Sequence, residues 1–400
     1  MEKLAIFGGN PVVTELFPAF PAFDKSDENA LIEVLHSGIW GGYNPKVGEF
    51  ERAFADFHES RFGITAANGT VTLETALAAA GIGQGDEVIV PPVSFIATAT
   101  AVLRVGATPV FVDIDGPTCN IAPSGIRAAI TGKTRAVIPV HFAGQPADMD
   151  EIMETAREHD LVVIEDCAHA HGAAWRGKKI GSFGDFGSFS FQASKNLTAG
   201  EGGFLTCNDD ELAEKARSIC NQGRRTGGAW YEHVRLGTNL RITGWQAAIL
   251  LTQFARLPEQ IKTREGNAAV LNERLKDIDL ISLAHVDERV TQHSHYLYLI
   301  RLNLERSPGL TKERFVEALA AEGVPCSVGY PQPLYKNQVF KEGNHITNDC
   351  PEAERMCKDT FWLSHEVMLS MPAQASSAAA AIAKVADSVD ALTDRKALGI

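Results

Sequence analysis

The sequence predicts an α/β fold with a large domain, built on a mostly parallel sheet flanked by helices, and a small C-terminal α+β domain. Three observations lead to this prediction. Short β-rich runs alternate with helical ones between about residues 62 and 210, which is typical of a parallel sheet with crossover helices. The β-rich runs are nearly all apolar, as expected when helices cover both sheet faces. The chain of 400 residues also exceeds the size at which one hydrophobic core usually stops growing.

The first elements along the chain are an arm and two helices. Residues 1–23 are rich in proline, phenylalanine and glycine and predict an extended N-terminal arm. Helical periodicity follows over 24–35 and over 47–59, and the glycine-containing stretch 37–42 separates these two helices. We expect the large domain to cover residues 24–245.

The large domain is expected to alternate strands and helices up to a long loop. The predicted strands are 88–90, 108–113, 135–141, 161–165, 188–191 and 203–207, and the predicted helices are 72–80, 95–105, 123–130, 149–159 and 210–220. Residues 221–245 hold turn residues, arginines and tryptophans, and therefore predict a long ordered loop.

The rest of the chain predicts a connecting helix and the small domain. The helix over 246–276 is long enough to join two domains. The small domain, 277–400, is expected to hold a strand in HSHYLYLIRLNL, a helix over 311–322, a short strand near 326–330 and a helix within 374–392.

Charge and composition argue against several classes of function. A net charge of −13 without a basic stripe argues against a nucleic-acid partner. The longest apolar runs fall far short of the roughly 18 residues of a membrane span, and the N-terminus lacks the pattern of a signal peptide. Seven scattered cysteines predict reduced thiols and a cytoplasmic protein. His169 and His171 lie near Cys167, but this spacing favours core or pocket histidines, so no metal is expected.

A single lysine in a glycine-rich stretch is the first candidate for chemistry. Lys195 follows a predicted strand and precedes Gly200, Gly202 and Gly203, where the backbone can adopt unusual dihedral angles. A solvated loop lysine is the usual interpretation of such a residue. In a partly dry site, however, a lysine can act as a nucleophile and form a Schiff base with an aldehyde cofactor.

Two further segments could bind parts of the same ligand. Asn68, Gly69 and Thr70 precede a predicted helix, so free amides and the Thr70 hydroxyl could hold a phosphate; the alternative is an ordinary helix cap by Thr70. Asp166 ends the strand LVVIED, at the sheet edge where α/β proteins bind ligands. Its carboxylate could keep a pyridine nitrogen protonated, although strand-end acids also cap helices or bind metals.

Phe95 and Ser190 complete this candidate site. The ring of Phe95 could cover one face of a planar cofactor, with core packing as the alternative. Ser190 could bind another phosphate oxygen, with a solvent-facing serine as the alternative. A phosphate cradle, a strand-end aspartate and a downstream lysine, in that order in an alternating α/β domain, are what pyridoxal 5'-phosphate requires.

Several longer motifs carry a family resemblance over nearly the whole chain. They are VGEFERAFADF (47–57), NGT (68–70), GDEVIVPPVSFIATATAV (85–102), PVHFAGQPADMD (139–150), IEDCAHAHGA (164–173), FSFQASKNLTAGEGG (189–203) and GTNLRITGWQAA (237–248). Through them the chain resembles the DegT-type (DegT/DnrJ/StrS) sugar aminotransferases, which are fold-type I pyridoxal phosphate enzymes. Within that family it is most similar to the cyclitol aminotransferases and the 3-amino-5-hydroxybenzoate synthases.

The resemblance implies a role for each candidate residue. Lys195 would form the internal aldimine, and Asp166 would pair with the pyridinium nitrogen. Phe95 would stack on the ring, and His169 would lie near the phenolic oxygen. The phosphate would be held by Gly69, Thr70, the amide of Val71, Ser190 and, from the neighbouring subunit, Asn239. A homodimer with shared active sites is therefore implied.

The resemblance also implies the reaction and leaves its substrates open. We expect an aminotransferase that moves an amino group from L-glutamine or L-glutamate to a keto-cyclitol or keto-sugar, as in amino sugar and antibiotic biosynthesis. A nucleotide-linked keto-sugar acceptor is one alternative, and a dehydratase or aromatising synthase that keeps Lys195 is another. Candidate substrate contacts are Arg224, Arg225, Tyr231 and His295.

Overall fold

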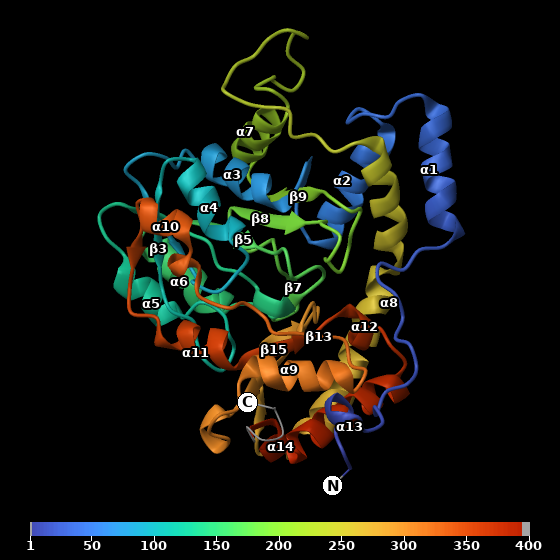
Figure 1. Cartoon of the computed structure of the whole chain (residues 1–400). Coiled ribbons are helices and arrows are strands. Elements are labelled where there is room, and N and C mark those ends of the chain that lie inside the picture. The colour runs from blue at the N-terminus through green and yellow to red at the C-terminus, as the bar shows by residue number, and fades with distance from the viewer. Residues whose placement is uncertain (1, 394–400) are drawn as a thin grey trace.

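A mixed eight-stranded sheet forms the centre of the larger part of the molecule (Figure 1). The computed structural model describes residues 2–393. The strand order is β1-β9-β8-β5-β4-β2-β3-β14, and all neighbours are parallel except β1 with β9 and β9 with β8. The strands are β1 Phe62–Ala66, β2 Glu87–Val90, β3 Thr108–Phe111, β4 Thr134–Val137, β5 Val162–Asp166, β8 Phe186–Ser190, β9 Gly203–Cys207 and β14 Ile346–Thr347. The prediction of a mostly parallel sheet is confirmed.

Helices cover both faces of this sheet, and each face has its own hydrophobic core. The helices are α1 Lys25–Ser37, α2 Pro45–Phe57, α3 Gly69–Ala79, α4 Ala97–Arg104, α5 Pro123–Ala129, α6 Met149–Glu158 and α7 Asp210–Cys220. One core contains residues of α3, α4 and α7, and the other contains residues of α2, α5 and α6. Successive residues of β5 alternate between them, since Val163 lies in the second core and Ile164 in the first.

The start of α3 differs from the predicted helix and from the predicted cap. The helix begins at Gly69, three residues earlier than expected, because Asn68 is its N-cap and its side-chain oxygen accepts a hydrogen bond from the Val71 amide at 3.0 Å. Thr70 therefore lies inside the first turn and is not the capping residue. Strand β1 just before it was not predicted from the sequence.

A long helix connects this part to a smaller antiparallel sheet. Helix α8, Gly244–Leu275, starts with a capping box between Thr243 and Gln246. In Figure 1 it runs from the upper part with the large sheet to the lower part with α9 and α13. The small sheet has the order β10-β12-β15-β13, with β10 Ile281–Leu283, β12 Tyr298–Leu302, β13 Cys326–Ser327 and β15 Thr360–Leu363.

The remaining elements pack around the small sheet or between the two parts. They are α9 Lys312–Ala321, α10 Gln338–Glu342, α11 Pro351–Asp359, α12 His365–Met368, α13 Pro372–Asp387, α14 Val389–Thr393, the strands β6 Ala174–Trp175, β7 Lys178–Lys179 and β11 Val290–Gln292, and the 3-10 helices η1 Ala5–Phe7, η2 Phe142–Gly144, η3 Leu304–Arg306 and η4 Leu334–Lys336. The helix expected within 374–392 is thus two helices. The division into domains stays a prediction, and residues 394–400 of the predicted small domain lie outside the described residues.

The N-terminal arm is tied to the small sheet and its helices. Leu4 and Val13 belong to the core that α9 and α13 share with that sheet. The buried carboxylate of Glu322 accepts hydrogen bonds from the backbone amides of Ala5 and Val12, at 2.8 and 3.0 Å. The arm is therefore part of the folded structure on this side of the molecule.

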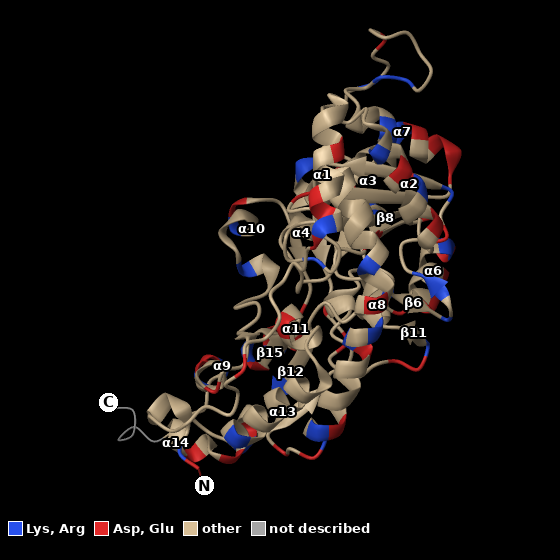
Figure 2. Ribbon diagram, turned by 90° about the vertical axis from the view of Figure 1, so that its right-hand side faces the viewer, with Lys and Arg blue, Asp and Glu red and all other residues tan. Residues whose placement is uncertain are grey.

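Charged side chains of both signs are distributed over the surface on one side of the molecule. On the side that Figure 2 presents, lysines and arginines are interspersed with aspartates and glutamates. Within residues 2–393, no helix combines the length and the apolar character that crossing a membrane requires.

Candidate active site

A cavity of about 750 Å³ opens at the carboxyl ends of β5 and β8 and contains nearly all the predicted site residues. Of the residues predicted to bind or react with a cofactor, those that line this cavity are Gly69, Thr70, Val71, Phe95, Asp166, His169, Ser190 and Lys195. They come from α3, the loop before α4, the end of β5, the end of β8 and the loop after it. The fold thus brings together segments that lie up to 126 positions apart in the sequence, between Gly69 and Lys195.

The N-terminus of α3 and the end of β8 form a cradle for an anion. A β-carbon on Gly69 would lie 2.7 Å from that of Ser190, so only glycine allows this close approach. Among the described residues, the amides of Gly69 and Thr70 have no hydrogen-bond partner, and they point out of a helix start that favours negative charge. The Val71 amide is already used by Asn68. The cradle is therefore formed by Gly69, Thr70 and Ser190, and the amide contact implied for Val71 is not free in this structure.

Asp166 is a buried carboxylate with its own supporting contacts. It is 5% exposed, accepts a hydrogen bond from the Thr98 hydroxyl at 2.8 Å, and accepts another from the Ala168 amide at 3.2 Å. Burial raises the pKa of Asp166, whereas these two hydrogen bonds and the charge of Lys195 act in the opposite direction. A protonated pyridine nitrogen would be a suitable partner for this carboxylate.

Thr98 is a site residue that the sequence reasoning missed. Its hydroxyl bridges Asp166 and the Ser94 hydroxyl, which lies 2.8 Å away. The signal in the sequence was the spacing of three between Phe95 and Thr98, which would place both residues on one side of the predicted helix 95–105. The other lining residues that were missed are Leu73, Ala97, Ala168, Gln192, Ser194, Glu201, Tyr296 and Tyr330.

Lys195 is buried, so the interpretation as a solvated loop lysine is wrong. The residue is 9% exposed, and its Nζ lies 4.6 Å from the centre of the Tyr296 ring. The Tyr296 hydroxyl in turn hydrogen-bonds the Ser194 hydroxyl at 2.9 Å. An amine in this setting faces the cavity with an aromatic surface on one side.

His169 and Phe95 supply the aromatic surfaces of the cavity. The His169 ring stacks on Tyr296 with centroids 4.2 Å apart, and its Nδ1 accepts a hydrogen bond from the Ala143 amide at 3.3 Å. Burial lowers the pKa of His169 well below its usual value, so the ring is neutral and carries its proton on Nε2. Phe95 is 57% exposed at the cavity wall, which makes core packing the wrong interpretation of this residue.

Among residues 2–393, one group of three side chains has the spacing of a possible metal site. Ligand atoms of His141, Glu165 and Cys167 lie within 4.8 Å of one another. His141 Nδ1 accepts a hydrogen bond from the Ala147 amide, so its Nε2 carries the proton and donates to Glu165 at 3.2 Å. Glu165 also accepts hydrogen bonds from three backbone amides within 181–184. These contacts already use the His141 and Glu165 lone pairs that a metal would need.

Several other candidate residues do not line the cavity. Asn239, Arg224, Arg225 and Tyr231 belong to the segment between α7 and α8, and part of this segment extends beyond the body of the molecule in Figure 1. His295 is half-buried and stacks on His293, with centroids 3.8 Å apart, beside a separate small cavity. His295 is therefore not placed to contact a ligand beside Lys195.

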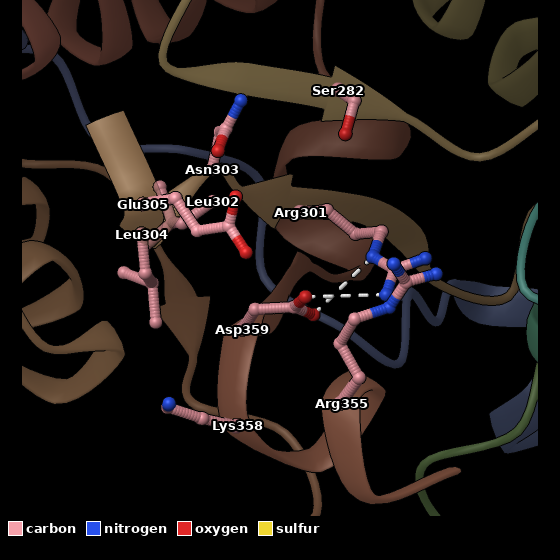
Figure 3. Close-up of a pocket in the computed structure, with 9 residues that line it drawn as sticks. All are labelled: Ser282, Arg301, Leu302, Asn303, Leu304, Glu305, Arg355, Lys358 and Asp359. Carbon is pink, nitrogen blue, oxygen red and sulfur yellow. Dashed lines mark hydrogen bonds and ion pairs between the residues drawn. The ribbon is translucent and has the colours of Figure 1, made fainter. Parts of the chain in front are cut away.

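A second cavity, of about 480 Å³, lies beside the small sheet (Figure 3). Its main charged contact is the ion pair between Arg301 and Asp359, at 3.2 Å. Arg355 at its edge pairs with Glu352. The cavity contains none of the predicted site residues, and its charges are largely compensated within the protein.

Comparisons with known proteins agree with this geometry. A profile of the DegT/DnrJ/EryC1/StrS aminotransferase family matches residues 21–381. A Streptoalloteichus tenebrarius protein named "Putative L-glutamine:3-amino-2,3-dideoxy-scyllo-inosose aminotransferase" is 40% identical, over 98% of this chain and 99% of that protein. The L-glutamine:2-deoxy-scyllo-inosose aminotransferase of Streptomyces fradiae is 38% identical, over 96% and 98% of the two chains.

A solved structure extends the likeness to three dimensions. The crystal structure of 3-amino-5-hydroxybenzoic acid synthase superimposes with a TM-score of 0.87 at 35% identity, and the match covers 92% of this chain and 98% of that one. The family resemblance predicted from the motifs, including the fold type, is confirmed. The chain belongs to the DegT/DnrJ/EryC1/StrS aminotransferase family and is a pyridoxal phosphate-dependent aminotransferase.

Proposed function

We propose that the protein transfers the amino group of L-glutamine to a keto-cyclitol, with Lys195 and Asp166 as its catalytic residues. The observation that carries this proposal is the cavity in which a buried lysine, a buried aspartate and the start of α3 meet. The names of the two relatives above support the donor and the acceptor class. L-glutamate is the second donor to test, and a keto-sugar is the second class of acceptor.

The residues of the cavity fit pyridoxal 5'-phosphate. When bound, this cofactor supplies an aldehyde carbon that accepts amines and a pyridine ring that stores the electron pair left by proton removal. Gly69, Thr70 and Ser190 would hold the phosphate through amides and hydroxyls. Asp166 would accept the pyridine N–H, and Phe95 would cover one face of the ring. His169 would donate a hydrogen bond from Nε2 to the phenolic oxygen.

Lys195 has two tasks in this proposal. In the resting enzyme its Nζ would hold the cofactor covalently. As a free amine, Nζ would have a lone pair with which it could take the α-proton of the amino donor and carry that proton to the carbon that accepts it. The Tyr296 ring beside Nζ limits the access of water to the amine.

The charges around the cavity favour a carbocyclic acceptor over a nucleotide-linked one. Among the described residues that line the cavity, Lys195 is the only lysine or arginine, and Glu201 adds a carboxylate. A diphosphate would meet no cation of this chain apart from Lys195, whereas hydroxyl or amino groups on a cyclitol could hydrogen-bond to Glu201, Gln192 and Tyr330. This observation supports a keto-cyclitol.

Exposed apolar residues near Asn239 support a homodimer. Trp230, Tyr231 and Leu236 are 79%, 76% and 95% exposed on the segment before α8, and such clusters mark interaction surfaces. Asn239 does not line the cavity of its own chain. We propose that it reaches the phosphate cradle of a second copy.

All seven cysteines are free thiols, which supports a cytoplasmic location.

An aromatising synthase or dehydratase is the second candidate function. The structural likeness to 3-amino-5-hydroxybenzoic acid synthase supports it. Such an enzyme would keep Lys195 and release water instead of transferring an amine, so its product would form without an amino donor.

The donor and acceptor are tested by two half-reactions on the holoenzyme. L-glutamine should convert the cofactor to its aminated form, as measured by the cofactor absorbance, and a keto-cyclitol such as an inosose should reverse the change. A nucleotide-linked keto-sugar should reverse it much more slowly, because Lys195 is the only lysine or arginine among the described residues of this chain that line the cavity. Reversal by the nucleotide-linked sugar alone, or water release without a donor, would contradict the proposal.

Replacement of Asp166 tests its role at the ring nitrogen. Asp166→Asn should still bind the cofactor but should lower kcat on the order of 10²-fold or more, since general acid–base and charge effects of this kind contribute about 10²–10⁴-fold. The matched control is Asp185→Asn, which changes a half-buried carboxylate just before β8 that accepts a hydrogen bond from the Val163 amide. Equal rates of proton removal in Asp166→Asn and the wild type would contradict the role.

The shared active site is tested by mixing two inactive variants. Lys195→Ala and Asn239→Asp should each be inactive alone, the second because a carboxylate would repel the phosphate. After subunit exchange, a mixed C2 dimer has one site with both native residues, so activity should return to about a quarter of the wild-type value. Subunit exchange is verified by mass spectrometry of the mixed dimer. If exchange occurs and activity does not return, the proposal that Asn239 acts in the site of the second copy is wrong.

A further inference from the structure

A buried arginine without a carboxylate partner lies behind the loop that carries Lys195. Arg264 belongs to the middle of α8, and its side chain is fully buried. Among the described residues, no carboxylate lies within ion-pair distance of it. Burial lowers the pKa of Arg264 to about 9. A buried charge is costly unless its environment compensates it, so the contacts that Arg264 does make are informative.

These contacts fix the protonation of a neighbouring histidine. Arg264 Nη2 lies 2.6 Å from His365 Nδ1, and Nη1 donates to the His295 carbonyl at 3.2 Å. An arginine has only donors, so His365 Nδ1 must accept and His365 Nε2 must carry the ring proton. Burial and the charge of Arg264 lower the pKa of His365 to about 3, which keeps the ring neutral.

The histidine transmits this contact to the peptide bond of the catalytic lysine. His365 Nε2 donates to the Ser194 carbonyl at 2.6 Å. That carbonyl belongs to the planar peptide group that joins Ser194 to Lys195, and the Lys195 amide of the same group donates to the Gln192 carbonyl at 2.9 Å. Both ends of the peptide plane from which the Lys195 side chain starts are therefore held.

The N-terminal arm closes the other side of the histidine. The Phe20 ring stacks on His365 with centroids 3.8 Å apart and an interplanar angle of 6°. His365 is 6% exposed and packs between this ring and the hydrogen bonds to Arg264 and Ser194. The arm, α8, α12 and the loop after β8 thus meet at one imidazole.

We propose that Arg264 and His365 are positioning residues for Lys195. Arg264 fixes the tautomer and orientation of His365, and His365 fixes the backbone of Lys195, so that only the lysine side chain moves when Nζ leaves and returns to the reacting carbon. A carboxylate beside Arg264 would compete with His365 for the guanidinium, which gives a reason for its absence. This inference rests on the proposed function of Lys195.

Four variants distinguish the effect of the Arg264–His365–Ser194 hydrogen bonds from that of general packing. Arg264→Met removes the donors, and His365→Leu removes the ring. His365→Gln keeps the pattern, because the amide oxygen can accept from Arg264 and the amide nitrogen can donate to Ser194. The matched control is Asn267→Leu, about one turn along α8, because Asn267 hydrogen-bonds the Met368 and Ser370 carbonyls and, among the described residues, makes no hydrogen bond to the lysine loop.

The readout is the reaction of the apoprotein with pyridoxal 5'-phosphate, followed by absorbance without substrates. In this step the neutral Nζ forms a carbon–nitrogen double bond with the aldehyde carbon, and one water leaves with the aldehyde oxygen and the two amine hydrogens. A displacement of about 1 Å can cost on the order of 10²-fold in rate, so Arg264→Met and His365→Leu should react about 10²-fold more slowly. His365→Gln and Asn267→Leu should stay close to the wild type.

A second ligand distinguishes positioning from loss of the whole site. Pyridoxamine 5'-phosphate has no aldehyde and cannot bond to Lys195, so its affinity for all five proteins, wild type included, should agree to within about twofold. Wild-type reaction rates in Arg264→Met and His365→Leu, or an equal loss in Asn267→Leu, would overturn the inference. If Arg264→Met does not fold, the inference is tested by comparing the reaction rates of His365→Gln and His365→Leu, and equal rates would overturn it. A wild-type reaction in Lys195→Ala would instead refute the proposed function.

Discussion

Two adjacent carboxylates at the end of β5 hold the site in place, and they face opposite sides of the sheet. Successive strand residues point to opposite faces, so Asp166 enters the cavity while Glu165 points into the other core. Glu165 accepts hydrogen bonds from three backbone amides of the loop 181–184 and from the His141 imidazole. Because that loop leads directly into β8, the same strand end that presents Asp166 also fixes the start of the strand that presents Ser190. A displacement of β5 would move both.

The remaining parts of the site are assembled around this strand end. The close approach of Gly69 to Ser190 brings the start of α3 against the end of β8, which sets the distance between the anion cradle and Asp166. Two residues from the C-terminal part of the chain contact the Lys195 loop. Tyr296 lies beside the Lys195 Nζ, and His365 hydrogen-bonds the Ser194 carbonyl. The site therefore depends on contact between both parts of the chain, and the long helix α8 contributes Arg264 to that contact.

The sequence was informative where the signals are local. Strand 203–207 and helix 210–220 were predicted to the residue, because an apolar run ends at Asn208 and Asp209 caps the helix that follows. Lys195, Asp166 and the cradle could be predicted because each stands in a motif at a strand or helix end. The Asn68 cap was misplaced by two residues, since Asn68 and Thr70 are both good caps and only the structure distinguishes them.

What the sequence did not show depends on distant contacts. Tyr296 and His365 lie 101 and 170 positions after Lys195, and nothing local marks them as neighbours.

The most direct test of the central claim is reduction of the holoenzyme with sodium borohydride, followed by peptide mapping. We predict one reduced cofactor per chain, attached to Lys195. Attachment to another lysine, such as the half-buried Lys179 or the buried Lys312, or no attachment at all, would contradict the account.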